Sequence, residues 1–245
     1  MLIDLDLNKP MNDIIFKNVY KEYPTSEQPV LSDVSLTLTE GSFSVLVGES
    51  GSGKSTILKI IAGLLTETSG SVESTSSISM AFQSGALFPW LTVYENVALP
   101  LRSQKDTETS IKKKSLEALI EMGLTEYRDK LPKELSGGQR QRVGIARALA
   151  TDSQTILLDE PFSALDIKTT KELHSDLIAL WQKTGKTIVM VSHSIEEAVA
   201  LAQHIYLMDE GKLVKTFDID MAYPRDESST DLLLKVQEIR KVFLG

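Results

Sequence analysis

The chain has 245 residues, of which 42% are hydrophobic and 24% charged, as expected for one large globular domain or two small ones. Its formal net charge of −8 argues against non-specific binding to nucleic acid, which needs a basic surface. The absence of cysteine excludes disulfides and cysteine-ligated metals. No apolar run reaches the length of about eighteen residues that indicates a membrane-spanning helix.

Residues 1–11 are expected to form a loose N-terminal tail. They lack a basic region followed by an apolar one, so the sequence predicts no secretory signal, and Met11 is an alternative start. Residues 12–245 are expected to form the folded domain. A small antiparallel β layer is predicted to open it, with strands at residues 14–20 and 30–38. Residues 66–77 are polar and are interpreted as a turn region.

A glycine-rich segment follows the short apolar strand predicted at residues 43–47, and an apolar helix ending near Gly63 comes after it. This order of strand, glycine loop and helix is typical of a phosphate-binding loop, whereas an ordinary glycine-rich turn with a surface lysine does not require it. Lys54 can then reach the β- and γ-phosphates, and the Ser55 hydroxyl can ligate Mg²⁺. The residues expected to contact the nucleotide are Gly48, Glu49, Ser50, Gly51, Ser52, Gly53, Lys54, Ser55 and Thr56.

The middle of the chain, about residues 85–150, is predicted to be mostly helical. A short strand at residues 78–82 precedes this region and ends at Gln83. Helices are expected at residues 92–102, 107–123 and 139–150, the first capped by Thr92 with Glu95 and the last capped by Ser136.

Strands and helices alternate in the C-terminal half, which predicts an α/β fold with a mostly parallel sheet. The expected strands are residues 155–160, 187–192, 205–208 and 212–217, and the expected helices are residues 167–183 and 195–203. Ligands of such sheets bind beyond the carboxyl ends of the strands.

Three predicted strand ends carry residues suited to nucleotide chemistry. The phosphate loop follows Val47, and we expect it to meet Asp159, Glu160 and His193 at one edge of the sheet. Asp159 can hold Mg²⁺, directly or through water, and Glu160 can orient or deprotonate the attacking water.

Each of these side chains also has a purely structural interpretation. Apolar strands often end in acidic residues, and His193 alone is equally well a hydrogen-bonded histidine at a strand end. Tyr23 either stacks on an adenine or covers an edge of the core. His174 and His204 have no acidic or histidine partners at metal-ligand spacing, so they are interpreted as structural.

A second glycine loop, Leu135-Ser136-Gly137-Gly138-Gln139, precedes a predicted helix and forms a second potential anion site. It cannot cover the phosphates of the first loop while it also ends a separate helical region. The simplest solution is that it caps the nucleotide of another copy.

Taken together, these motifs resemble those of the ATP-binding subunits of ABC transporters, over about residues 13–215. The matches, in the family's order, are residues 48–56 (Walker A), Gln83 (Q-loop), residues 135–139 (signature), residues 156–160 (Walker B), residues 163–166 (D-loop) and His193 (H-loop). The resemblance implies a P-loop NTPase domain with an N-terminal antiparallel β layer, an inserted helical subdomain at about residues 85–150 and a C-terminal extension at about residues 218–245.

The same resemblance implies ATP hydrolysis with Mg²⁺ and a role for each matching residue. The catalytic residues would be Lys54, Gln83, Glu160 and His193. The magnesium ligands would be Ser55, Gln83 and Asp159. Tyr23 would stack on the adenine of ATP, and further ATP contacts would come from Asp166 and, in the other copy, from Ser136, Gly138 and Gln139.

The implied partners are membrane-spanning permease subunits, a solute-binding protein and a second copy of the chain, but no nucleic acid. The subunit would lie peripherally on the cytoplasmic face of the cell membrane. The alternative interpretations of the sequence are an ABC ATPase of a lipid or lipoprotein system, a soluble non-transport ABC protein and an ordinary P-loop kinase. A kinase would not need residues 135–139, and soluble ABC proteins usually carry a second ATPase domain or coiled-coil insertions.

A narrower resemblance, to importers of nitrate, sulfonate, taurine or related small solutes, rests on residues 82–93, 95–97 and 224–226. Residues 71–77 depart from it, because many relatives carry a longer glycine-containing hairpin there. Within the first of these segments, Phe88-Pro89-Trp90 is either a piece of core or an exposed anchor for a helix of a membrane subunit.

Overall fold

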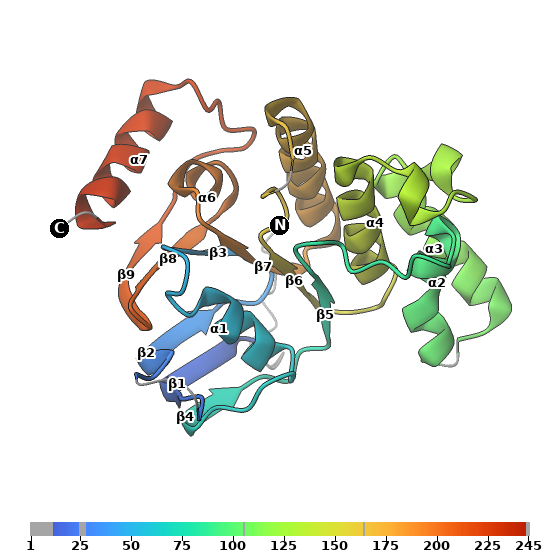
Figure 1. Cartoon of the computed structure of the whole chain (residues 1–245). Helices are drawn as coiled ribbons and strands as arrows, with labels where there is room; N and C mark the ends of the chain where they lie inside the picture. The colour runs from blue at the N-terminus through green and yellow to red at the C-terminus, as the bar shows by residue number, and fades with distance from the viewer. Residues whose placement is uncertain (1–11, 25–27, 105, 164, 244–245) are drawn as a thin grey trace, which may run out of the picture.

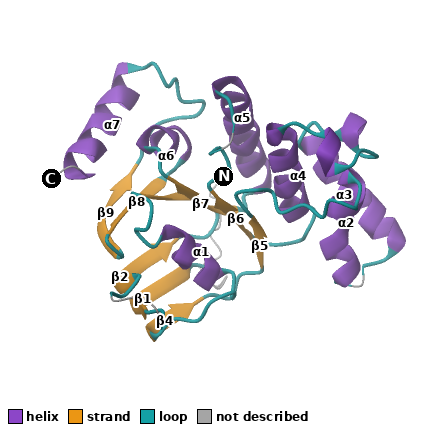
Figure 2. Ribbon diagram, in the orientation of Figure 1, coloured by secondary structure: helices purple, strands orange, loops and turns teal. Residues whose placement is uncertain are grey.

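The computed structural model describes residues 12–24, 28–104, 106–163 and 165–243, and these residues form two β-sheets with helices around them (Figures 1 and 2). The tail at residues 1–11, with Met11, lies outside the described residues. The first sheet is antiparallel, with the order β2 (Leu31–Leu38), β1 (Ile14–Lys21) and β4 (Ser69–Glu73).

Strand β4 corrects the interpretation of residues 66–77 as a turn region. The Ser- and Gly-rich composition of this segment hides a strand, because its stability comes from pairing with β1 rather than from side-chain propensity. Gly70 permits the close approach: at its φ of +89° a Cβ would lie 2.3 Å from the carbonyl oxygen of Asn18. The antiparallel β layer therefore has a third strand.

The second sheet confirms the predicted mostly parallel arrangement. It contains β3 (Phe43–Val47), β5 (Ile78–Ala81), β6 (Thr155–Asp159), β7 (Thr187–Ser192), β8 (His204–Asp209) and β9 (Lys212–Asp218), in the order β5-β6-β7-β3-β8-β9. Only β9 is antiparallel to its neighbour. Strands β3 and β7 are buried along their whole length, which explains their continuous apolar sequences.

The helices follow the predicted pattern with shifted ends. They are α1 (Lys54–Ile61), α2 (Val93–Ser103), α3 (Glu108–Glu121), α4 (Gly137–Leu149), α5 (Ile167–Thr184), α6 (Ile195–Leu201) and α7 (Thr230–Phe243), with short 3₁₀ turns at Thr125–Tyr127 and Pro132–Glu134. The predicted caps are present: the Thr92 side chain accepts a hydrogen bond from the Glu95 N–H, and Ser136 does the same for Gln139. Helix α7 lies in the C-terminal extension, for which the sequence indicated no element.

Two hydrophobic cores lie on the two faces of the parallel sheet. Strand β3 contributes to both, with Phe43, Val45 and Val47 on one side and Leu46 on the other. Helix α1 packs in the core shared with the antiparallel layer, while helices α2 to α7 pack in the other core. Figure 1 shows α2, α3 and α4 gathered beyond the β5 edge of the sheet.

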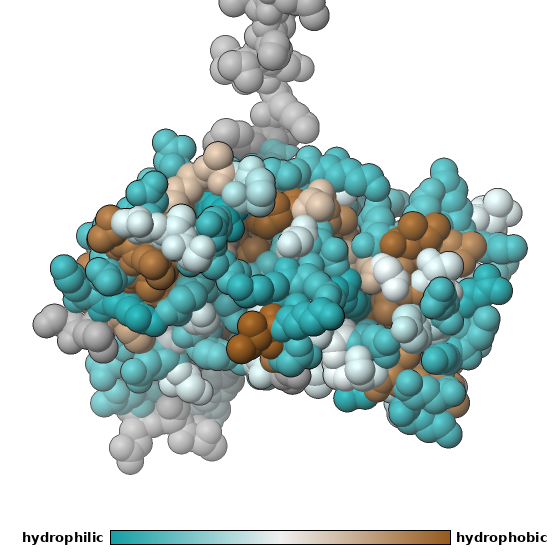
Figure 3. All heavy atoms as spheres, turned by 90° about the horizontal axis from the view of Figure 1, so that it is seen from above, coloured by the Kyte–Doolittle hydropathy of each residue, from teal (hydrophilic) through white to brown (hydrophobic). Residues whose placement is uncertain are grey.

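The division into subdomains stays a prediction, with a helical subdomain at about residues 85–150 and an extension at about residues 218–245. None of the described helices is both long and apolar enough to cross a membrane. Hydrophobic side chains on the face seen from above form separate patches on a largely hydrophilic surface (Figure 3).

Leu46→Ala tests the importance of the central strand. Leu46 is fully buried, so we expect the free energy of unfolding to fall by about 2–5 kcal/mol. The matched control is Leu64→Ala, because Leu64 is 58% exposed and its truncation should change stability by about 0.5 kcal/mol or less. Urea unfolding measures both values, and equal losses would contradict the placement of β3 at the centre of the core.

Candidate active site

The loop between β3 and α1 has the geometry of an anion-binding site. A Cβ on Gly48 would lie 2.1 Å from the carbonyl oxygen of Met208, so the loop passes too close to β8 for any other residue. Gly53 has a φ of +93° and caps α1 without a side chain, which leaves the first N–H groups of the helix free of any side-chain cap. Beside Gly51 there is open space, with no atom within 4 Å of a Cβ placed there.

Lys54 lies at the base of this loop and is almost completely buried. Its Nζ donates hydrogen bonds to the carbonyl oxygens of Gly48 at 2.9 Å and Glu49 at 2.5 Å, and to Ser52 Oγ at 3.1 Å. Burial lowers the pKa of Lys54, while the carboxylates of Glu160, Asp159 and Glu49 oppose this shift. The ammonium group is therefore held against the loop that it is expected to serve.

Ser55 and Asp159 form the candidate magnesium site. Ser55 Oγ donates a hydrogen bond of 2.9 Å to Asp159 Oδ1, which brings the start of α1 to the end of β6. Among the described residues there is no cluster of three or more His, Cys, Asp or Glu side chains that could hold a metal alone. A hydroxyl and one carboxylate fit Mg²⁺, which usually takes its remaining ligands from substrate phosphates and water.

Glu160 stands next to the phosphate loop in a constrained backbone conformation. Its φ is +45°, which is rare for a residue with a side chain, and its N–H donates to the carbonyl oxygen of Val191 on β7 at 3.1 Å. Gln83 Nε2 donates to Glu160 Oε2 at 2.9 Å, and His193 Nδ1 lies 4.0 Å from the same oxygen. Glu160 also lines the pocket of the phosphate loop.

The structure therefore brings together the three strand ends that the sequence singled out, and Gln83 with them. Gln83 follows β5 at the edge of the sheet, and its Nε2 also donates to Ser163 Oγ at 3.2 Å. Sequence reasoning named Ser163 only as the first residue of a motif and assigned it no contact.

A second residue missed by sequence reasoning is Glu197. Its Oε2 accepts a hydrogen bond of 2.5 Å from Ser192 Oγ, which in turn accepts from the Ser194 N–H at 2.9 Å, so this network encloses the backbone of His193. Burial raises the pKa of Glu197, and the hydrogen bond from Ser192 and the nearby His193 oppose the shift. The spacing of Ser194 and Glu197, which is that of a capping box, was the available signal.

The second glycine loop lies elsewhere on the molecule. Ser136 and Gln139 form a capping box at the start of α4, and a Cβ on Gly138 would lie 2.6 Å from Thr169 Cγ2 of α5. These three residues line a pocket with Arg142, Thr169 and others, and none of the residues of this pocket lines the pocket of the phosphate loop. A chain therefore does not bring its own two glycine loops to one described pocket.

The contacts of Asp166 and Tyr23 do not test the roles expected of them, which are an ATP contact and adenine stacking. Both roles therefore stay predictions. Asp166 caps α5 by accepting hydrogen bonds from the Thr169 N–H at 3.0 Å and Thr169 Oγ1 at 2.7 Å, which lower the pKa of Asp166. Tyr23 is half-buried after β1, with Lys21 Nζ 5.4 Å from its ring centre, and it is not among the residues that line the phosphate-loop pocket.

The other two histidines have acidic neighbours that sequence spacing could not reveal. His204 Nδ1 lies 2.7 Å from Asp218 Oδ1 on the paired strand β9. His174 is buried on α5, where its ring lies 4.5 Å from that of Phe162 and its Nδ1 lies 3.4 Å from Glu227 Oε1.

Comparison with known proteins agrees with this geometry. Residues 31–163, more than half of the chain, match the family described as ABC transporter. The chain belongs to the ABC transporter family, as its ATP-binding component, and is an ABC ATPase.

One relative is the aliphatic sulfonates import ATP-binding protein SsuB 1 of Shouchella clausii (strain KSM-K16). It is 38% identical over 229 residues, which cover 93% of this chain and 90% of the relative.

Solved structures of ABC ATPases share the fold. The dimeric post-hydrolysis state of the ATP-binding cassette MJ0796 with ADP and Pi has a TM-score of 0.77 and 35% identity, covering 85% of this chain and all of the other. The cbiO1 protein from Clostridium perfringens, part of the transporter complex cbiONQ, has a TM-score of 0.79 and 25% identity, covering 94% of each chain.

Gly53→Ala tests the phosphate loop. The new Cβ would lie 2.6 Å from Leu31 Cδ2 in a backbone conformation that alanine resists, so the loop must shift, and we expect ATP affinity to fall roughly tenfold or more. The control is Gly63→Ala, because Gly63 also has a positive φ but a Cβ there meets nothing within 4 Å. Titration calorimetry compares the two variants, and equal affinities would contradict the assigned role of the loop.

Proposed function

We propose that this ABC ATPase is the motor subunit of an importer for a small anionic or zwitterionic solute, of which aliphatic sulfonates are the leading class. The observation that carries the proposal is the 38% identity, over 93% of the chain, to an aliphatic sulfonates import ATP-binding protein. The segments at residues 82–97 and 224–226, which resemble this group of importers, support it.

The contacts at the sheet edge support a division of roles in ATP hydrolysis. Lys54 and the N–H groups at the start of α1 bind the phosphates. Ser55 and Asp159, with Gln83 as a further ligand, would hold Mg²⁺, which when bound would supply charge neutralisation at the phosphates. Glu160 accepts the proton of the attacking water, and Gln83 and His193 orient its carboxylate.

The separation of the two glycine loops supports a head-to-tail dimer. Ser136, Gly138 and Gln139 would contact the ATP bound by the other copy, because they line a pocket apart from the phosphate loop of their own chain. The dimeric state of a similar ABC cassette favours the same assembly. In it, Tyr23 would stack on the adenine and Asp166 would lie near the paired sites.

The loop after Gln83 has the features of a docking surface for a permease subunit. Trp90 is 71% exposed and Phe88 is 38% exposed, with ring centres 5.5 Å apart, so this apolar cluster is not core. Asn96 is fully buried and holds the loop by accepting from the Phe88 N–H and donating to the carbonyl oxygens of Phe88 and Leu91. A rigid loop with exposed aromatic side chains is a favourable anchor for a partner helix.

A second set of contacts joins this loop to α4, the helix that begins within the signature motif. Arg147 donates to the carbonyl oxygens of Gly85 and Ala86 at 2.8 Å. A permease docked on the loop would therefore act on both Gln83 and α4. The complex would place this subunit on the cytoplasmic face of the cell membrane, with a solute-binding protein supplying the solute.

Glu160→Gln tests the catalytic assignment. Loss of the general base should reduce ATP turnover about a hundredfold or more while ATP still binds. With ATP and Mg²⁺ the variant should sediment as a dimer, because the bound nucleotide persists. Lys54→Ala should instead weaken ATP binding itself. Hydrolysis by Glu160→Gln at the wild-type rate would refute the role of Glu160, and a monomer at saturating ATP would count against the dimer.

Trp90→Ala tests the docking surface. Uptake by the reconstituted complex tests the class of transported solute. If Trp90 is an interface anchor, binding to the permease should weaken by about 2 kcal/mol or more. ATP affinity should not change, since the phosphate loop is untouched. The assay reconstitutes the subunit with its cognate permease and measures complex formation and sulfonate uptake.

The matched control is Leu64→Ala, another exposed apolar side chain, in the turn after α1. Normal assembly of the Trp90 variant would move the docking site elsewhere. Failure of the subunit to co-purify with any membrane protein would favour a soluble ABC protein, and a cognate binding protein specific for a peptide, lipid or metal would overturn the solute class.

A further inference from the structure

Helix α6 follows His193 directly, and its position helps to determine where that histidine lies. It runs from Ile195 to Leu201 with Ser194 as its N-cap. A helix of this length is not stable in water without tertiary contacts. The His193 side chain is 60% exposed, so the backbone on its two sides, β7 and α6, must hold it in place.

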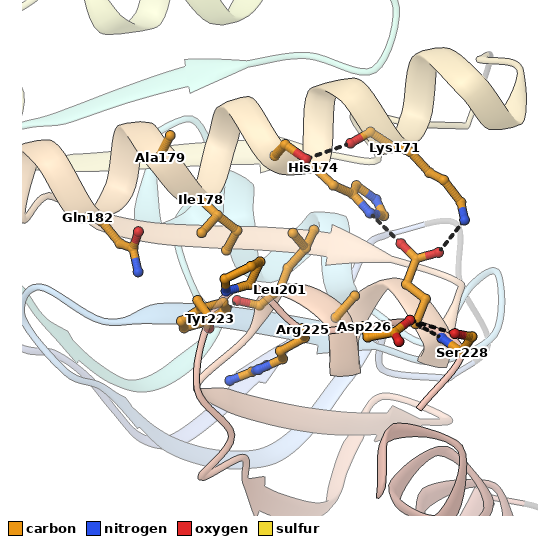
Figure 4. A pocket seen from close by; sticks show the side chains of 14 residues that line it. Lys171, His174, Ile178, Ala179, Gln182, Leu201, Tyr223, Arg225, Asp226 and Ser228 are labelled. Atoms are coloured by element: carbon orange, nitrogen blue, oxygen red, sulfur yellow. Dashed lines mark hydrogen bonds and ion pairs between the residues drawn. The ribbon is translucent and has the colours of Figure 1, made fainter. Parts of the chain in front are cut away.

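The C-terminal end of α6 is held by two side chains from the C-terminal extension (Figure 4). Arg225 Nη1 donates to the carbonyl oxygens of Val199 and Ala202, both at 2.7 Å, and the Tyr223 hydroxyl donates to that of Leu201 at 2.7 Å. These carbonyls belong to the last turn, where a helix leaves acceptors unpaired, and a cation is favourable there.

Arg225 is committed to this contact and is not free to bind a ligand. Its Nε and Nη2 donate to the carbonyl oxygens of Met221 and Ile219, both at 3.2 Å, and its guanidinium carbon lies 4.2 Å from the centre of the Tyr223 ring. Burial lowers the pKa of Arg225. All three guanidinium nitrogens of Arg225 thus donate to backbone carbonyls, and lysine does not reproduce this rigid fork.

The rest of the extension reinforces the same helix. Helix α7 packs on α6 through a buried face of Leu232, Val236 and Ile239, and Arg240 forms an ion pair with Glu196 in the first turn of α6. Because that ion pair is half-exposed, it adds little alone.

Glu227 continues the segment toward α5. Its carboxylate lies 3.2 Å from Lys171 Nζ and 3.4 Å from His174 Nδ1. Glu227 lines one pocket together with His193 and Glu197, so the extension reaches the side of the active site where the histidine lies.

We propose that residues 223–243, anchored by Arg225, position α6 and thereby hold His193 against Glu160 during ATP hydrolysis. This inference rests on the role proposed above for His193. Arg225 is a positioning residue: it lines neither of the two glycine-loop pockets, and its effect on turnover passes through the backbone of α6. The motif at residues 224–226 thus has a role in the ATPase itself.

The test is steady-state ATP hydrolysis by Arg225→Ala in the full chain. A loosened α6 displaces His193, so we expect kcat to fall roughly tenfold to a hundredfold, while KM for ATP stays within about twofold. Arg225→Lys, which keeps a cation near the helix end, should recover part of the loss. The matched control is Lys235→Ala, because Lys235 of α7 pairs only with Glu238 among the ion pairs of the described residues, and its kcat should match wild type.

A double-mutant cycle decides whether the effect passes through His193. In a His193→Ala background, Arg225→Ala should lower kcat no further, because both changes remove the same contribution, that of a correctly placed His193. A further drop of the same size, or a rise in KM with unchanged kcat, would overturn the inference. A wild-type rate for His193→Ala would refute the proposed role of His193, whereas a wild-type rate for a folded Arg225→Ala would refute the positioning role alone.

A milder variant keeps the test decisive if Arg225→Ala does not fold. Tyr223→Phe removes a single hydrogen bond, to Leu201, and leaves the ring in its contact with Trp181. We expect kcat to fall roughly twofold to fivefold with unchanged KM and a normal thermal unfolding curve. An unchanged kcat in this variant would overturn the inference.

Discussion

The parallel pairing of β6, β7 and β3 is the constraint on which the site depends. Val47 pairs with Ser192 and Asp159 pairs with Val191, so the residues that follow each strand emerge at the same edge of the sheet. A register shift of one residue would turn every side chain of a strand to the opposite face. The complete burial of β3 and β7 opposes such a shift.

The backbone conformation of Glu160 directs its carboxylate toward the other residues at this edge of the sheet. A left-handed residue at a strand end is unfavourable by about 1–3 kcal/mol, and here it is held by the hydrogen bond from its N–H to Val191. The resulting turn brings one carboxylate oxygen, Glu160 Oε2, within reach of both Gln83 and His193. Segments from three distant parts of the chain thus converge on one carboxylate.

Helix α4 links the loop proposed to dock a permease with the signature motif proposed to contact a second copy of the chain. Near its C-terminal end Arg147 binds the carbonyls of Gly85 and Ala86, and Gly144 packs so closely on Gly85 that a Cβ would lie 3.0 Å from its Cα. At its N-terminal end Gly138 lies against Thr169. Helix α4 therefore contacts the exposed aromatic loop near one end and α5 at the other, while the C-terminal extension holds α6.

The sequence by itself determined the phosphate loop, the acidic strand end, the capped helices and the mostly parallel sheet, because each depends on local composition or spacing. It did not reveal β4, whose Ser-Gly sequence is a strand only because β1 lies beside it. Nor did it reveal the contacts of Glu197 with Ser192, or of Arg225 with the end of α6. These depend on a backbone turn or on carbonyls left unpaired at a helix end, and only the tertiary structure decides which side chain reaches them.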